Sequence, residues 1–323
     1  METTYRPYQS EDDYWRMRAF LREVFVLNGF RERSWHVARL EYARWHTCLN
    51  CHNVTLNDVA HLWEADGRLI AFAMPDGGPD EVHMNVHPAW KTRELEEEML
   101  LVAEEKLSIP TADGKRFLGA WAMEDDTLRR QLLIDHGYKR EGWVETQHYR
   151  DLAQPIADVP TPAGFIIRPL KDGLELLERC YASGLGFHEG DIKIAVENRD
   201  DPTWYRNIQT APLYRRDLDL VAVAPDGSLA GFATIWYDDV TRAAAFEPVG
   251  VAPEHRRRGL GRALMEEGLR RAQWMGATRA HVASYGAAAH ATYASVGFTR
   301  YHLCERWQRT WEPADIPTDA SPR

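Results

Sequence analysis

The chain contains few cysteines and no long apolar segment. Four cysteines among 323 residues are too few for the disulfide framework of a small secreted protein. No apolar run approaches the roughly 20 residues that a membrane-spanning helix needs. Residues 1–9 also lack the apolar core of a signal peptide. We therefore expect a cytoplasmic protein that has no membrane partner.

Positive charge is also scarce in this sequence. Lysine and arginine together number 39, against 49 aspartates and glutamates, which gives a net charge of −10. Because nucleic-acid binding relies on basic surface that neutralises phosphates, we expect no nucleic-acid partner. The acidic balance suits a small cationic substrate instead. Hydrophobic residues at 44% and charged residues at 27% are typical of a soluble globular chain.

The most informative segment is Phe246 to Leu264, with the sequence FEPVGVAPEHRRRGLGRAL. An apolar stretch leads into Pro253, three arginines, and then Gly259 and Gly261 at the start of an amphipathic helix. Unpaired N–H groups at a helix start, together with the helix dipole, attract anions. Glycines let phosphate oxygens approach the main chain closely. This order predicts a pocket for a phosphate-bearing ligand.

The sequence around this segment predicts a sheet. Residues 219–224 and 229–237 are apolar runs joined by Pro225-Asp226-Gly227, which is typical of a hairpin with a glycine turn. Residues 244–251 form the next expected strand, with Pro248 inside it. Proline cannot donate to a strand ladder, so Pro248 predicts a bulge or a broken pairing.

Further elements are expected after the helix. Residues 278–285 read as a strand, followed by a helix through Tyr293 that ends at Gly297. Phe298 then begins a final pair of strands that ends near Trp311.

These features resemble the GCN5-related N-acetyltransferase (GNAT) family. Arg256, Gly259 and Gly261 match its motif R/Q-x-x-G-x-G/A, and ATYASVGFTR at residues 291–300 resembles its "LYExxGF" segment. The resemblance covers about residues 164–312. It implies an α/β fold, with a mixed, mostly antiparallel sheet flanked by helices, and it implies acetyl-CoA as the co-substrate in acetyl transfer to an amine.

The resemblance also implies which residues hold acetyl-CoA. The backbone N–H of Val249 would polarise the thioester carbonyl, and Val251 would hold the pantetheine arm. The residues expected at the diphosphate are Arg256, Arg257, Arg258, Gly259, Leu260, Gly261 and Arg262.

Acetyl transfer has three chemical requirements. The amine must lose a proton, the tetrahedral oxyanion needs a donor at about 3 Å, and the leaving thiolate must be protonated. Tyr293 matches the family's tyrosine that protonates the sulfur, and the alternative is a core aromatic residue before Gly297.

The general base is less clearly marked. Glu247 lies two residues before Val249, on the same face of the strand, so we expect it to act as the base through a water. Substrate contact and a structural role are the alternatives. Many family members carry the base two residues earlier, where this chain has Ala245, and His281 and Tyr285 are reserves.

The acceptor pocket is expected from residues 184–216. Its carboxylates and aromatic residues, with Glu189, Trp204 and Tyr205 as candidate substrate contacts, suit a cationic or sugar-bearing amine. The alternative is a solvated helix pair with a buried tryptophan.

The amino-terminal half repeats the same plan. Asp66-Gly67 precedes Asp226-Gly227 by 160 positions, and Gly137 precedes Gly297 by the same number. Such a constant spacing indicates a duplicated domain. In the first copy, Glu94 and Glu96 replace the two motif glycines. Two carboxylates would repel a diphosphate, so we expect this copy to hold no coenzyme A.

The resulting prediction is two tandem GNAT domains. Residues 1–152 form the degenerate copy, 153–163 a proline-containing linker, 164–312 the catalytic domain and 313–323 a flexible tail. The expected activity is transfer of acetyl to a primary amine of a small molecule, by a monomer or homodimer. The alternatives are a non-catalytic acyl-CoA sensor or scaffold, and an acetyltransferase for protein or peptide amines.

One cysteine–histidine cluster is not assigned to the site. His46, Cys48, Cys51 and His52 contain the C-x-x-C-H spacing of haem attachment. Four ligands within seven residues would strain a tetrahedral zinc site, and haem attachment needs export. We therefore expect no metal here.

Overall fold

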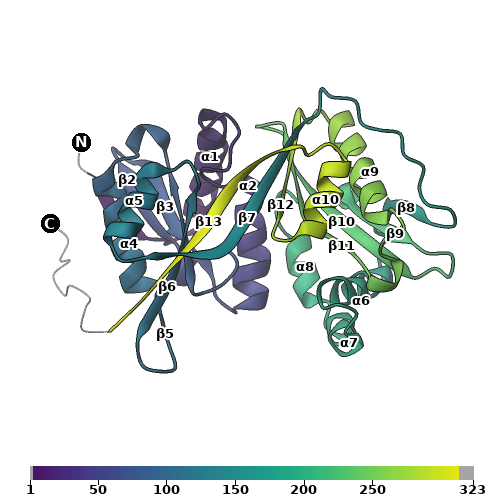
Figure 1. Ribbon diagram of the computed structural model, residues 1–323, viewed down its shortest axis with the longest axis horizontal. Coiled ribbons are helices and arrows are strands. Elements are labelled where there is room, and N and C mark those ends of the chain that lie inside the picture. Colours follow the sequence, from purple (N-terminus) through teal and green to yellow (C-terminus); the bar gives the residue numbers. More distant parts are fainter. Residues whose placement is uncertain (1–2, 313–323) are drawn as a thin grey trace. The chain divides into compact units, whose positions relative to one another are not determined.

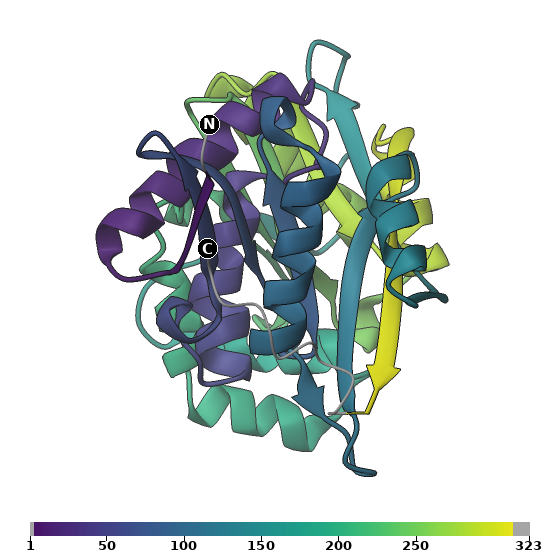
Figure 2. The same ribbon diagram turned by 90° about the vertical axis from the view of Figure 1, so that its left-hand side faces the viewer.

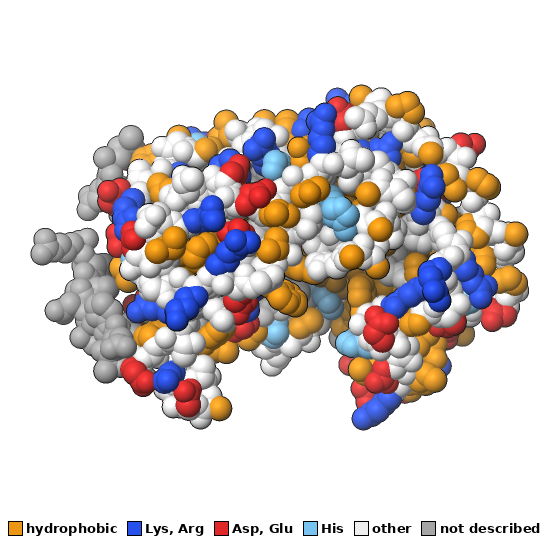
Figure 3. Space-filling view, viewed as in Figure 1, with side chains coloured by type: hydrophobic (Ala, Val, Ile, Leu, Met, Phe, Trp, Pro, Cys, Tyr) orange, Lys and Arg blue, Asp and Glu red, His pale blue; other side chains and the backbone are white. Residues whose placement is uncertain are grey.

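Figure 1 shows the computed structural model, which describes residues 3–312. The predicted flexible tail, residues 313–323, lies outside this range. Within the described range, the chain divides into two compact units, one comprising residues 3–145 and 302–312 and the other comprising residues 146–301. No helix within the described range is both long enough and apolar enough to cross a membrane. On the face shown in Figure 3, acidic and basic side chains are interspersed.

The carboxy-terminal unit, residues 146–301, is built on a mixed sheet. Its strand order is β7-β12-β11-β10-β9-β8, in which only the β11–β12 pair is parallel. The expected mixed, mostly antiparallel α/β sheet is thereby confirmed. The strands are β8 (Ile166–Pro169), β9 (Asp219–Val223), β10 (Leu229–Asp238), β11 (Ala243–Val251) and β12 (Arg279–Ser284), together with the end of β7 (Lys139–Asp151).

Helix α9 (Leu260–Trp274) packs tightly on this sheet. Its apolar stripe, which includes Leu264 and Leu269, joins Phe246 and Ile235 in one buried core. A Cβ at Gly268 would lie 2.7 Å from Cε1 of Phe246 and 2.9 Å from Cδ1 of Ile235, so glycine sets how closely the helix approaches the strands. The other helical elements of this unit are α6 (Glu175–Phe187), α7 (Ile192–Asp200), α8 (Thr203–Gln209), η3 (Arg216–Leu218), η4 (Pro253–His255) and α10 (Ala287–Ser295).

The amino-terminal unit has a similar sheet, with the order β1-β2-β3-β4-β6-β13 and a parallel pair between β4 and β6. Helix α4 (Arg93–Lys106) packs against β3 and β4 (Figure 2). Its strands are β1 (Thr3–Pro7), β2 (His61–Ala65), β3 (Arg68–Met74), β4 (Glu81–Val86), β5 (Ile109–Pro110), β6 (Arg116–Met123) and β13 (Arg300–Trp311). Its other helical elements are α1 (Glu11–Leu27), α2 (Val37–Tyr42), the π-helix η1 (Ala43–Cys51), α3 (Leu56–Val59), η2 (Pro88–Trp90) and α5 (Thr127–Asp135).

The last strand of each sequence repeat completes the sheet of the other repeat. In the carboxy-terminal unit, residues 146–151 of β7 pair with β12. In the amino-terminal unit, residues 304–311 of β13 pair with β6. The prediction of a final pair of strands after Phe298 is therefore wrong, because the structure has one long strand there, β13. The compact units also differ from the predicted ranges 1–152 and 164–312, because residues 302–312 group with the amino-terminal unit.

We expect Gly268→Ala to lower the free energy of unfolding of the carboxy-terminal unit by about 1–3 kcal/mol, the usual cost of overpacking a core. Urea unfolding followed by circular dichroism measures this change. Gly261→Ala in the same helix is the matched control, because its methyl would lie 3.5 Å from Cγ2 of Thr292, an ordinary contact. Equal stability of the two variants would contradict the packing argument.

Candidate functional site

Strand β11 is interrupted in the middle by a bulge. Val249 pairs with Ala233, and Phe246 pairs with Ile235, so Glu247 and Pro248 together oppose a single residue of β10. The peptide bond between Glu247 and Pro248 is cis. The bulge predicted at Pro248 is thereby confirmed, and its cause is the missing N–H of proline.

The bulge marks the point at which β11 leaves its parallel neighbour. In the described part of the chain, the pairing of β11 with β12 covers Ala243–Ala245 and ends at His281. Beyond the bulge, Val249 and Val251 pair with β10 on the other side. The indole N–H of Trp236 donates to the carbonyl oxygen of Glu247 at 2.5 Å, which fixes the bulged backbone.

The loop after β11 leads into the N-terminus of helix α9, which suits an anion. Gly259 caps α9 in a left-handed conformation, with φ of 84° and no side-chain cap, and the first turn contains no acidic residue. The first N–H groups of a helix have no acceptor within it. Arg257 also has a positive φ, 60°, and Arg258 is exposed. This end of the helix therefore concentrates positive potential.

Gly261 places the same turn beside β11. A Cβ at this position would lie 3.7 Å from Cγ2 of Val251 and 3.5 Å from Cγ2 of Thr292 on α10. The structure thus brings together two residues that the sequence assigned to the same co-substrate. A longer side chain at position 261 would have to occupy this space.

Arg256 has a different environment from the one the motif suggested. Its guanidinium donates to the carbonyl oxygens of Val251 at 3.1 Å and Gly186 at 2.9 Å, and it pairs with Glu189 at 2.7 Å. These contacts tie the end of α6 to β11. In this structure Arg256 therefore fastens the end of β11 to α6.

Tyr293 lies on α10 and is 7% exposed. Burial raises the pKa of its phenol, and the negative charge of Glu247 raises that pKa further. The phenol therefore keeps its proton well above neutral pH. The electrostatic effect also shows that the two predicted catalytic side chains lie within reach of each other's charge, although they come from α10 and β11.

His148 is a residue near Tyr293 that sequence reasoning missed. Its ring centroid lies 5.6 Å from that of Tyr293 and 4.8 Å from that of His290. Its Nε2 is 2.8 Å from Oγ of Ser284, and the side chain is fully buried at 1% exposure. Burial, together with the charge of His290, lowers the pKa of His148 to about 4. His148 belongs to the first sequence repeat and reaches this site because β7 joins β12, an exchange that no local motif signals.

The three expected substrate residues have different surroundings. Glu189 is exposed and pairs with Arg256, whereas Trp204 is half-buried on α8. Tyr205 is fully buried, and its hydroxyl donates to Oδ2 of Asp219 at 2.8 Å while Arg179 stacks 4.6 Å from its ring. No described contact joins Glu189 to Tyr205. Tyr205 is therefore part of an interior hydrogen-bond network around Asp219.

The matching helix of the amino-terminal unit is built differently at its start. The hydroxyl of Thr92 accepts from the N–H of Leu95 and so caps α4. Glu96 is fully buried and pairs with Arg129 at 2.7 Å and with Lys91 at 3.0 Å. This helix start therefore carries a side-chain cap and two acidic residues, Glu94 and Glu96, and both features disfavour an anion at a helix start.

The cysteine–histidine cluster forms part of the π-helix η1. Cys48 is buried and Cys51 is exposed, and Nε2 of His46 is 3.9 Å from Sγ of Cys51. Within residues 3–312, no group of three or more histidine, cysteine, aspartate or glutamate side chains is arranged to hold a metal ion.

Comparisons with known proteins agree with this architecture. Residues 178–298 match the model of the acetyltransferase (GNAT) family. Mycothiol acetyltransferase of Salinispora arenicola is 27% identical over 262 residues, which cover 76% of this chain and 80% of that protein. Streptothricin acetyltransferase of Streptomyces lavendulae is 49% identical over 45 residues, 14% of this chain and 24% of that protein.

Solved structures show the same fold. A tandem GNAT protein from the clavulanic acid biosynthesis pathway has a TM-score of 0.67 and 18% identity, and the match covers 97% of this chain and all of that chain. A GCN5-related N-acetyltransferase from Sphaerobacter thermophilus has a TM-score of 0.61 and 19% identity, with 96% of each chain covered. These likenesses confirm the predicted resemblance to tandem proteins of this fold.

The low pKa of His148 predicts a stability loss in acid. Between pH 6.5, the ordinary pKa of histidine, and about 4, the unfolded state binds more protons than the folded state. The free energy of unfolding therefore has its full value with respect to His148 above pH 6.5, and it falls as the pH decreases through this window. We expect His148→Gln, which stays neutral, to weaken this loss, as measured by hydrogen exchange of the β12 amides at pH 7 and pH 5.

His61→Gln is the matched control for this measurement. His61 is also buried, with a pKa lowered to about 4 by burial, but it lies in the amino-terminal unit. Its replacement should leave the pH dependence of the β12 amides as in the wild type. Parallel profiles for wild type and His148→Gln would contradict the assignment.

Proposed function

We propose that this chain, which belongs to the acetyltransferase (GNAT) family, transfers acetyl from acetyl-CoA to a primary amine of a small molecule in its carboxy-terminal unit. The observation that carries the proposal is the start of α9, which has a glycine N-cap, no acidic residue in its first turn, and a position beside Val251 of the bulged strand. Acetyl-CoA is the substrate that supplies both the diphosphate and the acyl group.

Three parts of the chain each bind a different part of acetyl-CoA. The N–H groups of the first turn of α9, with Arg257, Arg258 and Arg262, meet the diphosphate. Val251 holds the pantetheine arm, because it lies between this turn and the bulge. The N–H of Val249 then donates to the thioester carbonyl and stabilises the oxyanion that forms there.

The reaction removes two protons from the acceptor nitrogen and adds one to the leaving sulfur. Glu247 accepts the first proton from the ammonium of the acceptor through a water, and the free amine attacks the thioester carbon. The tetrahedral intermediate loses the second nitrogen proton to water, the C–S bond breaks, and the thiolate of coenzyme A takes a proton from Tyr293. Glu247 then releases its proton to solvent, and the phenolate of Tyr293 is reprotonated from solvent. While Glu247 holds its proton, the negative charge that raises the pKa of Tyr293 is absent, so the phenol is a better acid when the thiolate leaves.

The acceptor is proposed as a small cationic amine. The net charge of −10 favours cations, and the curated relatives carry names of acetyltransferases for mycothiol and streptothricin. An amine panel that includes aminoglycoside-like sugars, polyamines and an amino-terminal peptide separates a small-molecule enzyme from one that acts on peptides. Binding of acetyl-CoA without turnover of any amine would favour an acyl-CoA sensor instead.

We expect calorimetric titration of the full chain with acetyl-CoA to find one site per chain. Gly261→Glu should abolish binding, because a carboxylate in the first turn of α9 repels the diphosphate and fills the space beside Val251. Glu94→Gln, at the exposed position of the amino-terminal unit that matches Gly259, is the control and should bind like the wild type. Two sites per chain would overturn the assignment of a silent amino-terminal repeat.

We expect Tyr293→Phe to lower kcat by about 10²–10⁴-fold, the range for lost general acid catalysis, while calorimetric affinity for acetyl-CoA stays close to that of the wild type. Steady-state kinetics on the best amine of the panel measures this split. Tyr301→Phe is the matched control, since Tyr301 also packs near His148 but is 48% exposed. A Tyr293→Phe enzyme with wild-type kcat would exclude the phenol as the acid.

A further inference from the structure

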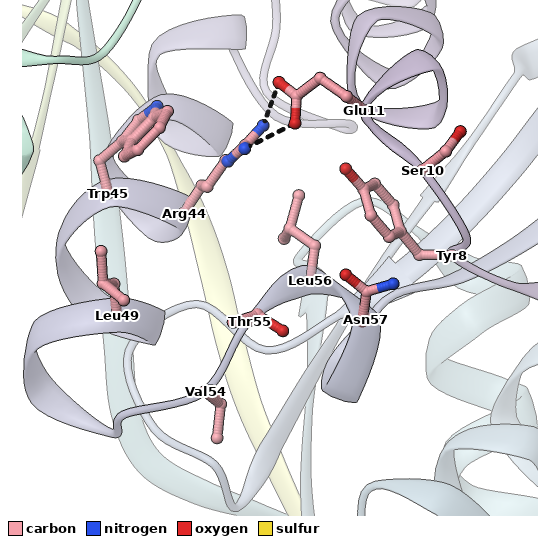
Figure 4. Close-up of a pocket in the computed structure, with 10 residues that line it drawn as sticks. All are labelled: Tyr8, Ser10, Glu11, Arg44, Trp45, Leu49, Val54, Thr55, Leu56 and Asn57. Atoms are coloured by element: carbon pink, nitrogen blue, oxygen red, sulfur yellow. Dashed lines mark hydrogen bonds and ion pairs between the residues drawn. The ribbon is translucent and has the colours of Figure 1, made fainter.

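The amino-terminal unit contains a cavity that the acetyl-transfer site does not use. Its volume is about 300 Å³, at the small end of the roughly 300–1,000 Å³ of ligand pockets. Three separate segments line it: the start of α1 with the residues before it, the π-helix η1, and the segment leading into α3 (Figure 4). The lining residues are Tyr8, Ser10, Glu11, Arg44, Trp45, Leu49, Val54, Thr55, Leu56 and Asn57.

One ion pair forms the charged wall of this cavity. The guanidinium of Arg44 makes two parallel hydrogen bonds to the carboxylate of Glu11, at 2.9 and 2.8 Å. Arg44 is held in place from the other side, because its guanidinium stacks 4.1 Å from the ring of Tyr14 and 4.5 Å from that of Trp45. Glu11, in contrast, has a side chain that is 55% exposed. A cation packed against two aromatic rings therefore faces an exposed carboxylate.

A hydroxyl group points into the same space. Tyr8 is only 6% exposed, and Figure 4 shows its hydroxyl directed towards the region between Arg44, Glu11 and Leu56. Burial raises the pKa of this phenol, so at neutral pH it is present as a hydroxyl that both donates and accepts. The opposite wall is apolar and includes Leu49, Val54 and Leu56.

The backbone of η1 is arranged so that it lines this cavity. A π-helix of nine residues, Ala43–Cys51, is unusual, and such helices occur frequently at functional sites. Because its hydrogen bonds span five residues, Arg44 and Leu49, five positions apart, come close to the same face. The helix η1 thus contributes Arg44 to the charged wall and Leu49 to the apolar wall, whereas an α-helix would turn these two side chains apart.

We propose that this cavity binds a small zwitterion, namely an α-amino acid with an apolar side chain. The ligand carboxylate replaces that of Glu11 on Arg44, and the ligand ammonium pairs with the displaced Glu11 and with the Tyr8 hydroxyl. The apolar side chain lies against Leu49 and Leu56. A simple anion would face the charge of Glu11, and a simple cation would face that of Arg44, whereas a zwitterion satisfies both groups.

The test is calorimetric titration of the full chain with L-phenylalanine and L-leucine. Binding of at least one of them is expected. The analogues 3-phenylpropionate and 2-phenylethylamine each lack one of the two charges of phenylalanine, so each should bind at least about tenfold more weakly than phenylalanine, given the usual contribution of a charged hydrogen bond. No binding of either amino acid overturns the proposal. Equal affinity for phenylalanine and a singly charged analogue overturns the zwitterion assignment.

Three variants test whether the amino acid binds in this cavity. Leu49→Trp fills the apolar wall without touching the ion pair and should abolish binding, and Glu11→Gln should weaken it while preserving the stacking of Arg44. Arg68→Met is the matched control, because Arg68 pairs with Glu23 on the same unit and does not line the cavity.

Amino acid binding that survives Leu49→Trp would belong to the amine acceptor site, and that result also overturns the proposal. Acetyl-CoA titration of Leu49→Trp should match the wild type, which separates this result from a failure of the proposed acetyl transfer.

Discussion

The interrupted ladder of β11 is the constraint on which the proposed site depends. A strand in mid-sheet normally uses its N–H and C=O groups on both neighbours. Here, the pairing with β12 ends at Ala245, and Glu247-Pro248 places two residues opposite one of β10. The backbone beyond the bulge is then available to a ligand on one side, while the pairing of Val249 and Val251 with β10 holds it rigid.

The other parts of the site are arranged around this interruption. Gly268 brings α9 close to Phe246, just before the bulge, and thereby fixes where the start of that helix, which has no side-chain cap, lies. Arg256 fastens the strand's end to α6 through the carbonyl oxygens of Val251 and Gly186. The start of α9 and the end of β11 are therefore positioned by packing and hydrogen bonds within the unit, so a ligand would not bear the entropy cost of ordering them.

Much of this arrangement could be predicted from the sequence, because it follows from local signals. The glycines at 259 and 261, the proline at 248 and the apolar runs of the strands are each readable within about ten residues, and the bulge at Pro248 was found where proline predicts it. What the sequence did not reveal depends on distant contacts. Arg256 matches a motif, yet its partners come from β11 and the end of α6. The burial of Tyr205 against Asp219 follows from the packing of α8, for which residues 184–216 carry no signal.

The exchange of final strands explains why His148 could not be predicted from local motifs. It also gives the amino-terminal repeat a role in the fold of the carboxy-terminal unit. The carboxy-terminal unit draws residues 146–151 from that repeat to cover β12. Without them, β12 would present an open edge, and Tyr293 would lose the ring of His148 from its surroundings. The first repeat therefore contributes directly to the fold of the second.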